Sequence, residues 1–485
     1  MKRIKALLLA MTMILTLTLA LAGCGTTTTV LSTYGEDEHV GGEVADQNSD
    51  SSDDSNDNVA SPNKDKNESS EEEKPSKNEG VVANPNANTK EEYEPYKNMT
   101  DKDKKATIHL MTHWKLSDAE QAVLDDFTEK YGTKVKVINV TLSLYQSKLA
   151  SMVASGDAPD LCEMSSDNFP TAIINNLVEP ISKGTAFNIE KDPELDIRQM
   201  DAFKWKGQYY GVNLRNNLTY QRYCIYYNET MFNNRGVKTP YKYWKEGKWN
   251  WDTFAELAKK MTFEKDGKKV YGYSGEDTEQ QGFLLAAGVD FVTNNNGKLT
   301  NNLKNQKLIK VLQGISELRA NGYWNPEDKG TGPFMQGLTA MCGSRTWLME
   351  KNQDFTTKMT DKWGAVPMPS PAGQEEIVGI SPNMWCIAKG AKNPSAASYV
   401  LRYWLDFDNW NINDVIVDKQ LLEVFNYMNK TNNAMATISQ GVTGYDDAAQ
   451  YYKLIYNTKI NKNDIPVSLE QAVPIIDDII NRISK

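Results

Sequence analysis

The chain has 485 residues, with 54 Lys and Arg against 64 Asp and Glu, and a net charge of −10. An acidic balance argues against nucleic acid or an anionic membrane surface as partner. Its only histidines are His39, His109 and His113, outside any H-E-x-x-H pattern, and no two cysteines form a C-x-x-C pair. Zinc or triad chemistry is therefore poorly supplied, and we expect no metal and no cofactor.

The first 23 residues predict an export signal. Basic residues at positions 2, 3 and 5 precede an apolar and Thr-containing run from Ala6 to Ala22. That run is short for a membrane-spanning helix. Leu21-Ala22-Gly23-Cys24 is similar to a bacterial lipobox, in which the cysteine carries lipid after cleavage; the alternative is an ordinary signal peptide with an incidental cysteine. We expect a protein lipidated at Cys24 and tethered to the membrane without spanning it.

Residues 24–105 predict a disordered acidic tether. They are dominated by Ser, Asp, Asn, Glu, Lys, Thr and Gly, a composition that buries too little apolar surface to order itself. From 25 to 105 there are 20 acidic and 9 basic residues, so almost all of the net charge lies in this segment. The remaining chain, 106–485, is nearly neutral and is long enough for two domains or lobes.

The start of the folded part alternates between strand and helix. Thr107 to Met111 predicts a strand, Ser117 to Lys130 a helix with a capping box, and Lys134 to Val140 a second strand. The stretch 145–167 predicts a helix that ends at Gly156, a turn, and a buried strand from Leu161 to Met164. This alternation favours a parallel sheet, at whose carboxyl edge ligands usually bind.

Later segments mix strands and helices. We expect a hairpin over 205–212, a strand over 220–227, a helix that begins near Asn250, a helix behind Asn393-Pro394, and a C-terminal helix that starts at Ser468 and is kinked or restarted at Pro474. Cys162, Cys224 and Cys386 stand in apolar or aromatic surroundings and are expected to be small buried hydrophobes; Cys342 also lacks a nearby cysteine partner.

Several motifs, in order along the chain, resemble the family 1 extracellular solute-binding proteins of bacterial ABC importers, of the sugar-binding, maltose-binding-protein-like type. Each motif alone is weak, because Gly, Pro and Asn mark turns in any protein. The motifs are Ser-Gly-Asp-Ala-Pro-Asp (155–160), Gly-x-x-Tyr-Gly (207–211), Tyr-Asn-x-x-x-Phe (227–232), Gly-x-x-x-Pro (236–240), Trp-x-Trp-Asp-x-Phe (249–254), Gly-x-x-Ala-Met (337–341), Val-Pro-x-Pro (366–369) and Lys-Asn-Pro (392–394).

The resemblance implies an α/β, two-lobed, periplasmic-binding-protein-like fold of type II, with discontinuous lobes joined by a hinge. By that analogy 106–212 and 373–430 form one lobe, and 213–372 and 431–485 form the other. It also implies a monomer that captures a sugar or oligosaccharide by hinge closure and delivers it to the transmembrane subunits of an ABC permease. No enzymatic activity is implied.

Sugar binding needs flat aromatic faces and forked polar side chains. The candidates lie at predicted strand ends and turns, and for Trp347 and Trp385 the resemblance also implies that their segments approach the cleft. The aromatic candidates are Trp114, Tyr220, Trp347 and Trp385, and each could equally pack in the core. The polar candidates are Lys115, Glu163, Asp167, Arg215, Asn216, Arg345 and Asn383, and each could equally serve in a surface ion pair or a turn.

Two alternatives to a binding protein stay open. A tethered glycoside hydrolase would need two carboxylates facing each other across a cleft, for which Glu163 and Asp167 could be offered. A surface adhesin would bind polymeric glycan without closing. Glu276, Asp277 and Glu279 are interpreted as a solvated charge run rather than a second acidic site.

Overall fold

The computed structural model describes residues 93–485, except 215–220, 328–329, 409–414, 432 and 445–448. Contacts between residues divide the chain into Met1–Lys74 and Pro75–Lys485, and all that follows concerns the described part of the second unit. None of its described helices is both long and apolar enough to cross a membrane. The predicted lipidation site, Cys24, lies outside the described residues.

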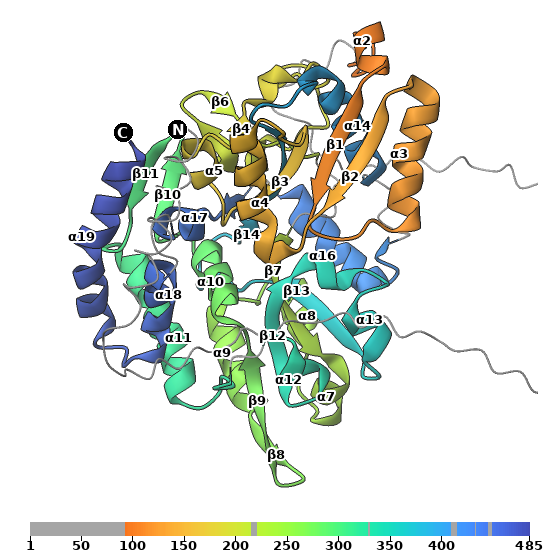
Figure 1. Ribbon diagram of the computed structural model, residues 1–485. Coiled ribbons are helices and arrows are strands. Elements are labelled where there is room, and N and C mark those ends of the chain that lie inside the picture. Colours follow the sequence, from red (N-terminus) through yellow and green to blue (C-terminus); the bar gives the residue numbers. More distant parts are fainter. Residues whose placement is uncertain (1–92, 215–220, 328–329, 409–414, 432, 445–448) are drawn as a thin grey trace, which may run out of the picture. The chain divides into compact units, whose positions relative to one another are not determined.

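The first sheet has five strands in the order β2-β1-β3-β15-β4 (Figure 1). β1 pairs with β2 and with β3 in parallel, as the alternating pattern predicted, while β15 is antiparallel to β3 and β4. Its strands are β1 (Thr107–Thr112), β2 (Lys134–Asn139), β3 (Leu161–Ser165), β4 (Val178–Glu179) and β15 (Asn383–Ala388). A late segment of the chain thus lies beside the third strand, which no local pattern could show.

Three longer helices accompany this sheet: α3 (Asp118–Tyr131), α4 (Leu142–Ser155) and α14 (Pro394–Asp408). The predicted caps are confirmed. Ser117 and Glu120 form a capping box at the start of α3, and Gly156 ends α4 in the left-handed conformation with φ of 77°. Shorter elements follow β3: α5 (Thr171–Ile174), η1 (Ile181–Lys183), α6 (Ile197–Met200) and η2 (Asp201–Phe203).

The second sheet is centred on β7 (Gln221–Asn228), whose residues are almost all buried. β7 pairs on one edge with β12 and on the other with β13 and β14, all antiparallel. The full order is β16-β14-β7-β12-β9-β8. The other strands are β8 (Phe263–Lys265), β9 (Lys268–Ser274), β12 (Thr339–Arg345), β13 (Trp363–Pro367), β14 (Val378–Ser381) and β16 (Ala434–Ala436).

Many short helices connect and cover this sheet. Asn250 caps the helix that begins at Trp251, as predicted, and Trp249 is buried in the core beside it. The helices are α7 (Glu229–Asn234), α8 (Pro240–Lys245), α9 (Trp251–Lys260), η3 (Asp277–Gln280), α10 (Gln281–Ala286), α11 (Gln306–Ala320), α12 (Gly332–Met335), η4 (Thr346–Met349), α13 (Asp354–Lys358) and α16 (Lys419–Lys430).

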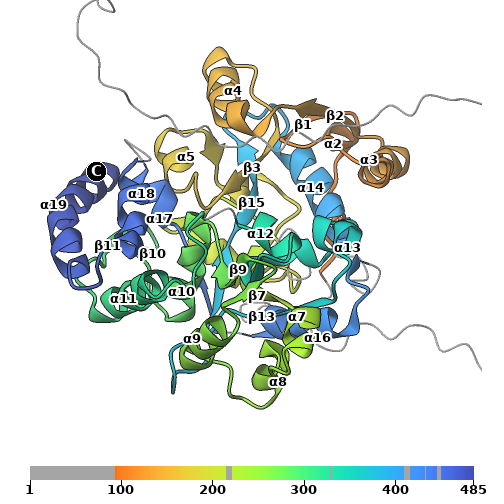
Figure 2. The same cartoon turned by 90° about the horizontal axis from the view of Figure 1, so that it is seen from below.

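Two hairpins and the C-terminal helices complete the described chain. The predicted hairpin near 205–212 is confirmed as β5 (Lys204–Trp205) and β6 (Gln208–Tyr209), and a second joins β10 (Val292–Asn295) to β11 (Lys298–Asn301). In Figure 2, α17 (Ser439–Thr443), α18 (Ala449–Tyr456) and α19 (Ile465–Ile483) gather with this second hairpin beside α11. η5 (Asn457–Lys459) links α18 to α19.

The prediction for the C-terminal helix was wrong about its start. α19 begins at Ile465, with Pro466 in its first turn, and continues through Pro474 to Ile483. Proline is well tolerated in the first turn because its missing N–H would be unpaired there anyway. Leu469, Ile476, Ile479 and Ile483 are buried, so packing of this apolar stripe accounts for a helix that continues past an interior proline.

Residues 93–105, which composition placed in the tether, are folded. Tyr96 stacks on Tyr131 of α3 with ring centroids 5.1 Å apart, and its hydroxyl donates to Asp406 of α14 at 3.0 Å. Thr100 then caps α2 (Asp101–Lys104) in a capping box. The tether prediction was wrong here because Tyr93 and Tyr96, within an otherwise polar stretch, bind to and pack against the folded part.

The chain passes between the two sheets more than once. It leaves the first sheet before β7, returns at Pro382 between β14 and β15, and leaves again after α14. Strand pairing joins β14 to β7, and α16 packs on β13. Residues 378–381 and 419–430 therefore associate with the second sheet, whereas the predicted division placed 373–430 with the first.

Candidate functional site

Polar residues at the carboxyl end of β3 lie where the first sheet meets the second. Ser166, directly after β3, donates its backbone N–H to the Pro382 carbonyl at 2.9 Å, and its Oγ lies 3.3 Å from the Oγ of Ser381 in β14. Asn168 accepts hydrogen bonds from the backbone N–H and hydroxyl of Ser165, both at 3.2 Å. These bonds hold the turn that carries Asp167.

Arg345 ends β12 in the second sheet and is held from several sides. Its Nη1 donates to Gln221 Oε1 at 2.9 Å, its Nε lies 3.7 Å from Glu279 Oε1, and its guanidinium carbon lies 5.1 Å from the centre of the Tyr223 ring. Tyr223 stands opposite Arg345 in the β7–β12 register. Arg345 is thus fixed in place by neighbouring strands and by η3.

The electrostatics of Asp167 and Arg345 are coupled across the two sheets. Burial raises the pKa of Asp167, and Arg345 and the Ser166 hydroxyl lower it. For Arg345, burial lowers the pKa, but Tyr223, Glu279 and Asp167 outweigh this and raise it. Asp167 nevertheless keeps an exposed side chain. Its carboxylate is therefore accessible to a solute.

Two further groups join this cluster. Glu279 is 8% exposed, and burial raises its pKa while Arg345 lowers it. Burial also raises the pKa of Tyr451, a fully enclosed residue of α18 that feels the charges of Tyr223, Asp167 and Arg345. The interpretation of 276–279 as a solvated charge run was wrong for Glu279, because η3 turns this side chain inward.

Glu163 belongs to a second group, on the first sheet alone. Its Oε2 lies 3.1 Å from His113 Nδ1, and its backbone N–H donates to the Tyr145 hydroxyl at 2.8 Å. Trp114 is half-buried and donates its indole N–H to Glu120 at 3.0 Å. Lys115 beside it is exposed. This group carries a histidine that the sequence reasoning did not single out.

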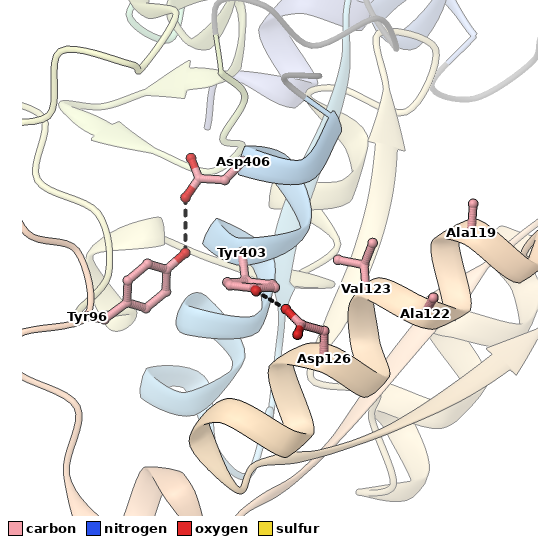
Figure 3. A pocket seen from close by; sticks show the side chains of 7 residues that line it. All are labelled: Tyr96, Ala119, Ala122, Val123, Asp126, Tyr403 and Asp406. Carbon is pink, nitrogen blue, oxygen red and sulfur yellow. Dashed lines mark hydrogen bonds between the residues drawn. The ribbon is translucent and has the colours of Figure 1, made fainter. Parts of the chain in front are cut away.

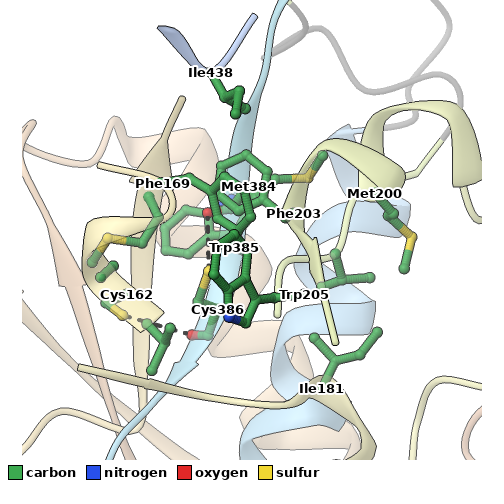
Figure 4. Packing of buried hydrophobic residues seen from close by; sticks show 14 of the residues in the cluster. Cys162, Phe169, Ile181, Met200, Phe203, Trp205, Met384, Trp385, Cys386 and Ile438 are labelled. Carbon is green, nitrogen blue, oxygen red and sulfur yellow. Dashed lines mark hydrogen bonds between the residues drawn. The ribbon is translucent and has the colours of Figure 1, made fainter. Parts of the chain in front are cut away.

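The structure separates the two predicted tryptophans of the later segments. Trp385 in β15 is 2% exposed and packs edge-on to Trp114 and Trp404, with ring centroids 6.0 and 6.2 Å away. Figure 4 shows it among other buried side chains, including Phe203 and Met384. This burial favours packing over ligand contact for Trp385. Trp347 in η4 is 38% exposed, two residues after Arg345, so its ring remains available to a ligand.

The remaining predicted site residues are placed only in part. Asn383 starts β15 opposite Ser165, and its carbonyl accepts a hydrogen bond from the Asn213 side chain at 3.2 Å. Arg215, Asn216 and Tyr220 lie outside the described residues. The contacts of all these side chains with a solute stay a prediction.

Sequence reasoning missed Ser166, Tyr223, Glu279, Ser381 and Tyr451. Ser166 could have been found, because it stands directly before Asp167 in the same turn. The others come to Arg345 and Asp167 only through strand pairing and the packing of α18, which the sequence does not encode locally.

Three hollows lined by described residues measure about 490, 330 and 190 Å³, and none is lined by a predicted site residue. No group of three or more His, Cys, Asp and Glu side chains suited to a metal ion occurs among the described residues. The cluster around Arg345 consists of hydrogen-bonding side chains from the first and the second sheet, among them Asp167 and Glu279.

The fold is that of the two-lobed, maltose-binding-protein-like binding proteins. An ABC substrate-binding protein from Listeria monocytogenes in complex with cycloalternan is similar, at 17% identity and a TM-score of 0.58 over 77% of this chain and 98% of that one. The cyclic alpha-maltosyl-1,6-maltose binding protein from Arthrobacter globiformis is similar at 16% identity and a TM-score of 0.59, over 77% of this chain and 99% of that one. An extracellular solute-binding protein from Staphylococcus aureus in complex with maltose is similar at 15% identity and a TM-score of 0.58, over 77% of this chain and 98% of that one.

The model of the bacterial extracellular solute-binding protein family matches residues 122–413, and the chain belongs to this family. No curated protein sequence matches it.

Proposed function

We propose that this protein is the lipid-anchored solute receptor of an ABC importer and that it captures a sugar or oligosaccharide between its two lobes. The family match supports this proposal, and Asp167 in the turn after β3 of the first sheet and Arg345 at the end of β12 of the second supply polar groups from both lobes. The similar proteins in complex with cycloalternan and maltose favour a carbohydrate.

The chemistry of the cluster suits adjacent hydroxyl groups. A carboxylate accepts, and a guanidinium donates, two hydrogen bonds in a fork, and charge assistance makes such bonds stronger than neutral ones. The exposed ring of Trp347, close to Arg345 in the chain, supplies an aromatic face for the apolar side of a pyranose. No covalent step is needed for capture.

Hinge closure is the proposed mechanism. The lobes meet where the chain passes between the sheets: before β7, at Pro382, and between α14 and α16. A solute that contacts Asp167 on one lobe and Arg345 on the other binds the closed form better than the open form, and only this difference shifts the population. The closed, loaded monomer is then presented to the permease.

Carbohydrate titration tests the solute class. We expect maltose, a maltotetraose-length dextrin or a mannotriose to bind saturably and unchanged, and we expect Asp167→Asn to weaken binding about tenfold or more. Asp157→Asn is the matched control, because Asp157 is an exposed carboxylate in the preceding turn. If no carbohydrate binds while another solute class does, the carbohydrate assignment fails.

A second experiment tests the anchor. Cys24→Ser should move the protein from the membrane fraction to the soluble extracytoplasmic fraction, since a lipidated cysteine is the proposed attachment. An unchanged distribution would contradict lipidation at Cys24.

The two alternatives are distinguished by their outcomes. A glycoside hydrolase would convert a glycoside and lose this activity with Glu163→Gln. A non-closing adhesin would bind long glycan without any change in small-angle scattering, whereas a hinged receptor should become more compact when loaded.

A further inference from the structure

A groove of about 490 Å³ lies between α3 and α14, and none of the predicted site residues lines it. On α3 it is lined by Ala119, Ala122, Val123 and Asp126, which follow one another at helical spacing on one stripe. Tyr403 and Asp406 of α14, together with Tyr96, form the opposite side (Figure 3). All seven lining residues are described.

The groove exists because small side chains stand where larger ones fill the same interhelical space further along. Beyond Asp126, Phe127 and Tyr131 of α3 pack against Tyr403 with ring centroids 5.1 and 6.0 Å apart. At Ala119 and Ala122 no ring or long side chain takes that place, and both alanines are exposed. An unfilled apolar surface of this kind has room for a side chain from another molecule.

The polar groups of the groove are acidic. Tyr96 donates to Asp406 at 3.0 Å, and Tyr403 donates to Asp126. Arg402, one turn before Asp406 on α14, is shared between Asp406 and the buried Asp192. One guanidinium between two carboxylates leaves a net negative charge at this end of the groove.

The surrounding helix surface has the same sign. Asp118, Asp125 and Glu129 of α3 are exposed, against a single basic residue of this helix, Lys130. Lys130 already shows what the tyrosine rings accept: its Nζ lies 5.4 Å from the centre of Tyr131 and 5.6 Å from that of Tyr403. The faces of these rings favour cations.

We propose that this groove is a docking site for a partner protein, which inserts an arginine side chain flanked by apolar residues between α3 and α14. The guanidinium meets Asp126 and Asp406 and stacks on tyrosine, while the apolar neighbours cover Ala119 and Ala122. Arginine fits better than lysine because its planar head both stacks on a ring and forks onto a carboxylate. This proposal does not depend on the solute that the candidate site binds.

The test uses the purified protein and two synthetic peptides, acetyl-leucyl-arginyl-leucinamide and its citrulline counterpart, which has the same shape without the charge. Saturation-transfer NMR titrations should show saturable binding of the arginine peptide, weakening as salt is raised, and binding of the citrulline peptide weaker by about tenfold or more. Equal binding of both peptides, or no saturable binding of the arginine peptide at millimolar concentration, would overturn the proposal.

Matched variants locate the site. Ala122→Leu fills the groove and should abolish peptide binding, whereas Gln121→Leu places the same leucine side chain one residue away, outside the lining, and should leave binding intact. Asp126→Asn should weaken binding more than Asp125→Asn, which removes a charge from the same helix outside the lining. An unchanged melting temperature shows that each variant folds, and binding that survives Ala122→Leu in a folded protein contradicts the assignment.

Discussion

Removing Arg345 should leave a buried carboxylate without its compensating charge. Glu279 is 8% exposed, and its Oε2 has no hydrogen-bond partner among the described residues. Breaking a buried ion pair by removing one partner typically costs 3–5 kcal/mol. Because Arg345 Nε approaches Glu279 only to 3.7 Å, we expect Arg345→Met to lower the free energy of unfolding by about 3 kcal/mol at pH 7, the lower end of that range.

The dependence on pH identifies the cause. Arg345 lowers the pKa of Glu279, so its loss raises that pKa further, and the carboxyl group takes up a proton on moderate acidification. Urea unfolding should therefore show a smaller cost of Arg345→Met at pH 5 than at pH 7. Adding Glu279→Gln should recover most of the loss in a double-mutant cycle. A cost that is the same at both pH values, or additive single variants, would refute this account.

Four other predictions follow from burial. Burial raises the pKa of both Asp192 and Asp290 to about 6 from the ordinary 3.8, so between these pH values the folded state holds more protons than the unfolded state and stability falls as pH rises. Each group contributes up to about 3 kcal/mol to this change, and Asp290→Asn should make the dependence of stability on pH less steep. Stability that rises from pH 4 to 6 in the same way in the wild type and the variant would contradict this. At Gly441 a Cβ would lie 1.9 Å from the Phe169 carbonyl oxygen, so Gly441→Ala should lower the free energy of unfolding by about 1–3 kcal/mol. Because the substitution would displace the turn that carries Asp167, it should also weaken solute binding. Gly332→Ala is the control, since Gly332 has open space around it, and it should change neither stability nor binding. Cys162, Cys224, Cys342 and Cys386 are buried and unpaired, and burial raises the pKa of Cys162, so a thiol reagent should label them only after unfolding; rapid labelling of the native protein would be inconsistent with this packing. Trp385→Ala should cost about 3–5 kcal/mol of stability, whereas Trp347→Ala should change stability little and solute affinity more; the reverse pattern would exchange their roles.

Local patterns predicted what local interactions determine. The capping box of Ser117 and Glu120, the left-handed Gly156 and the Asn250 cap are each decided within a few residues, and each is confirmed. Cys162, Cys224 and Cys386 are buried and free, in agreement with their apolar surroundings. By contrast, Tyr96 and the start of α19 depend on packing partners distant in the chain. Composition misled at Tyr96, and the predicted start at Ser468 misled at α19.

The candidate site shows the same division. Strand ends are visible in sequence, and this was enough to single out Asp167 and Arg345. The side chains that give these two their electrostatic environment, Tyr223 and Glu279, come from β7 and η3 and are brought there by sheet pairing. For Trp385 the sequence left ligand contact and core packing equally open, and pairing of β15 between β3 and β4 buries its side chain.

The electrostatics of the site also bear on the choice between a receptor and a glycoside hydrolase. A hydrolase needs two carboxyl groups whose environments push their pKa values apart, one to stay protonated and one to stay ionised. Near Arg345, burial raises the pKa of both Asp167 and Glu279, and the same guanidinium lowers both. These two carboxyl groups are therefore not set apart from each other, and Glu163, the carboxylate offered together with Asp167 for a hydrolase, lies 3.1 Å from His113 instead. We therefore expect a bound oligosaccharide to be recovered intact after prolonged incubation, and its hydrolysis would refute this reading of the charges.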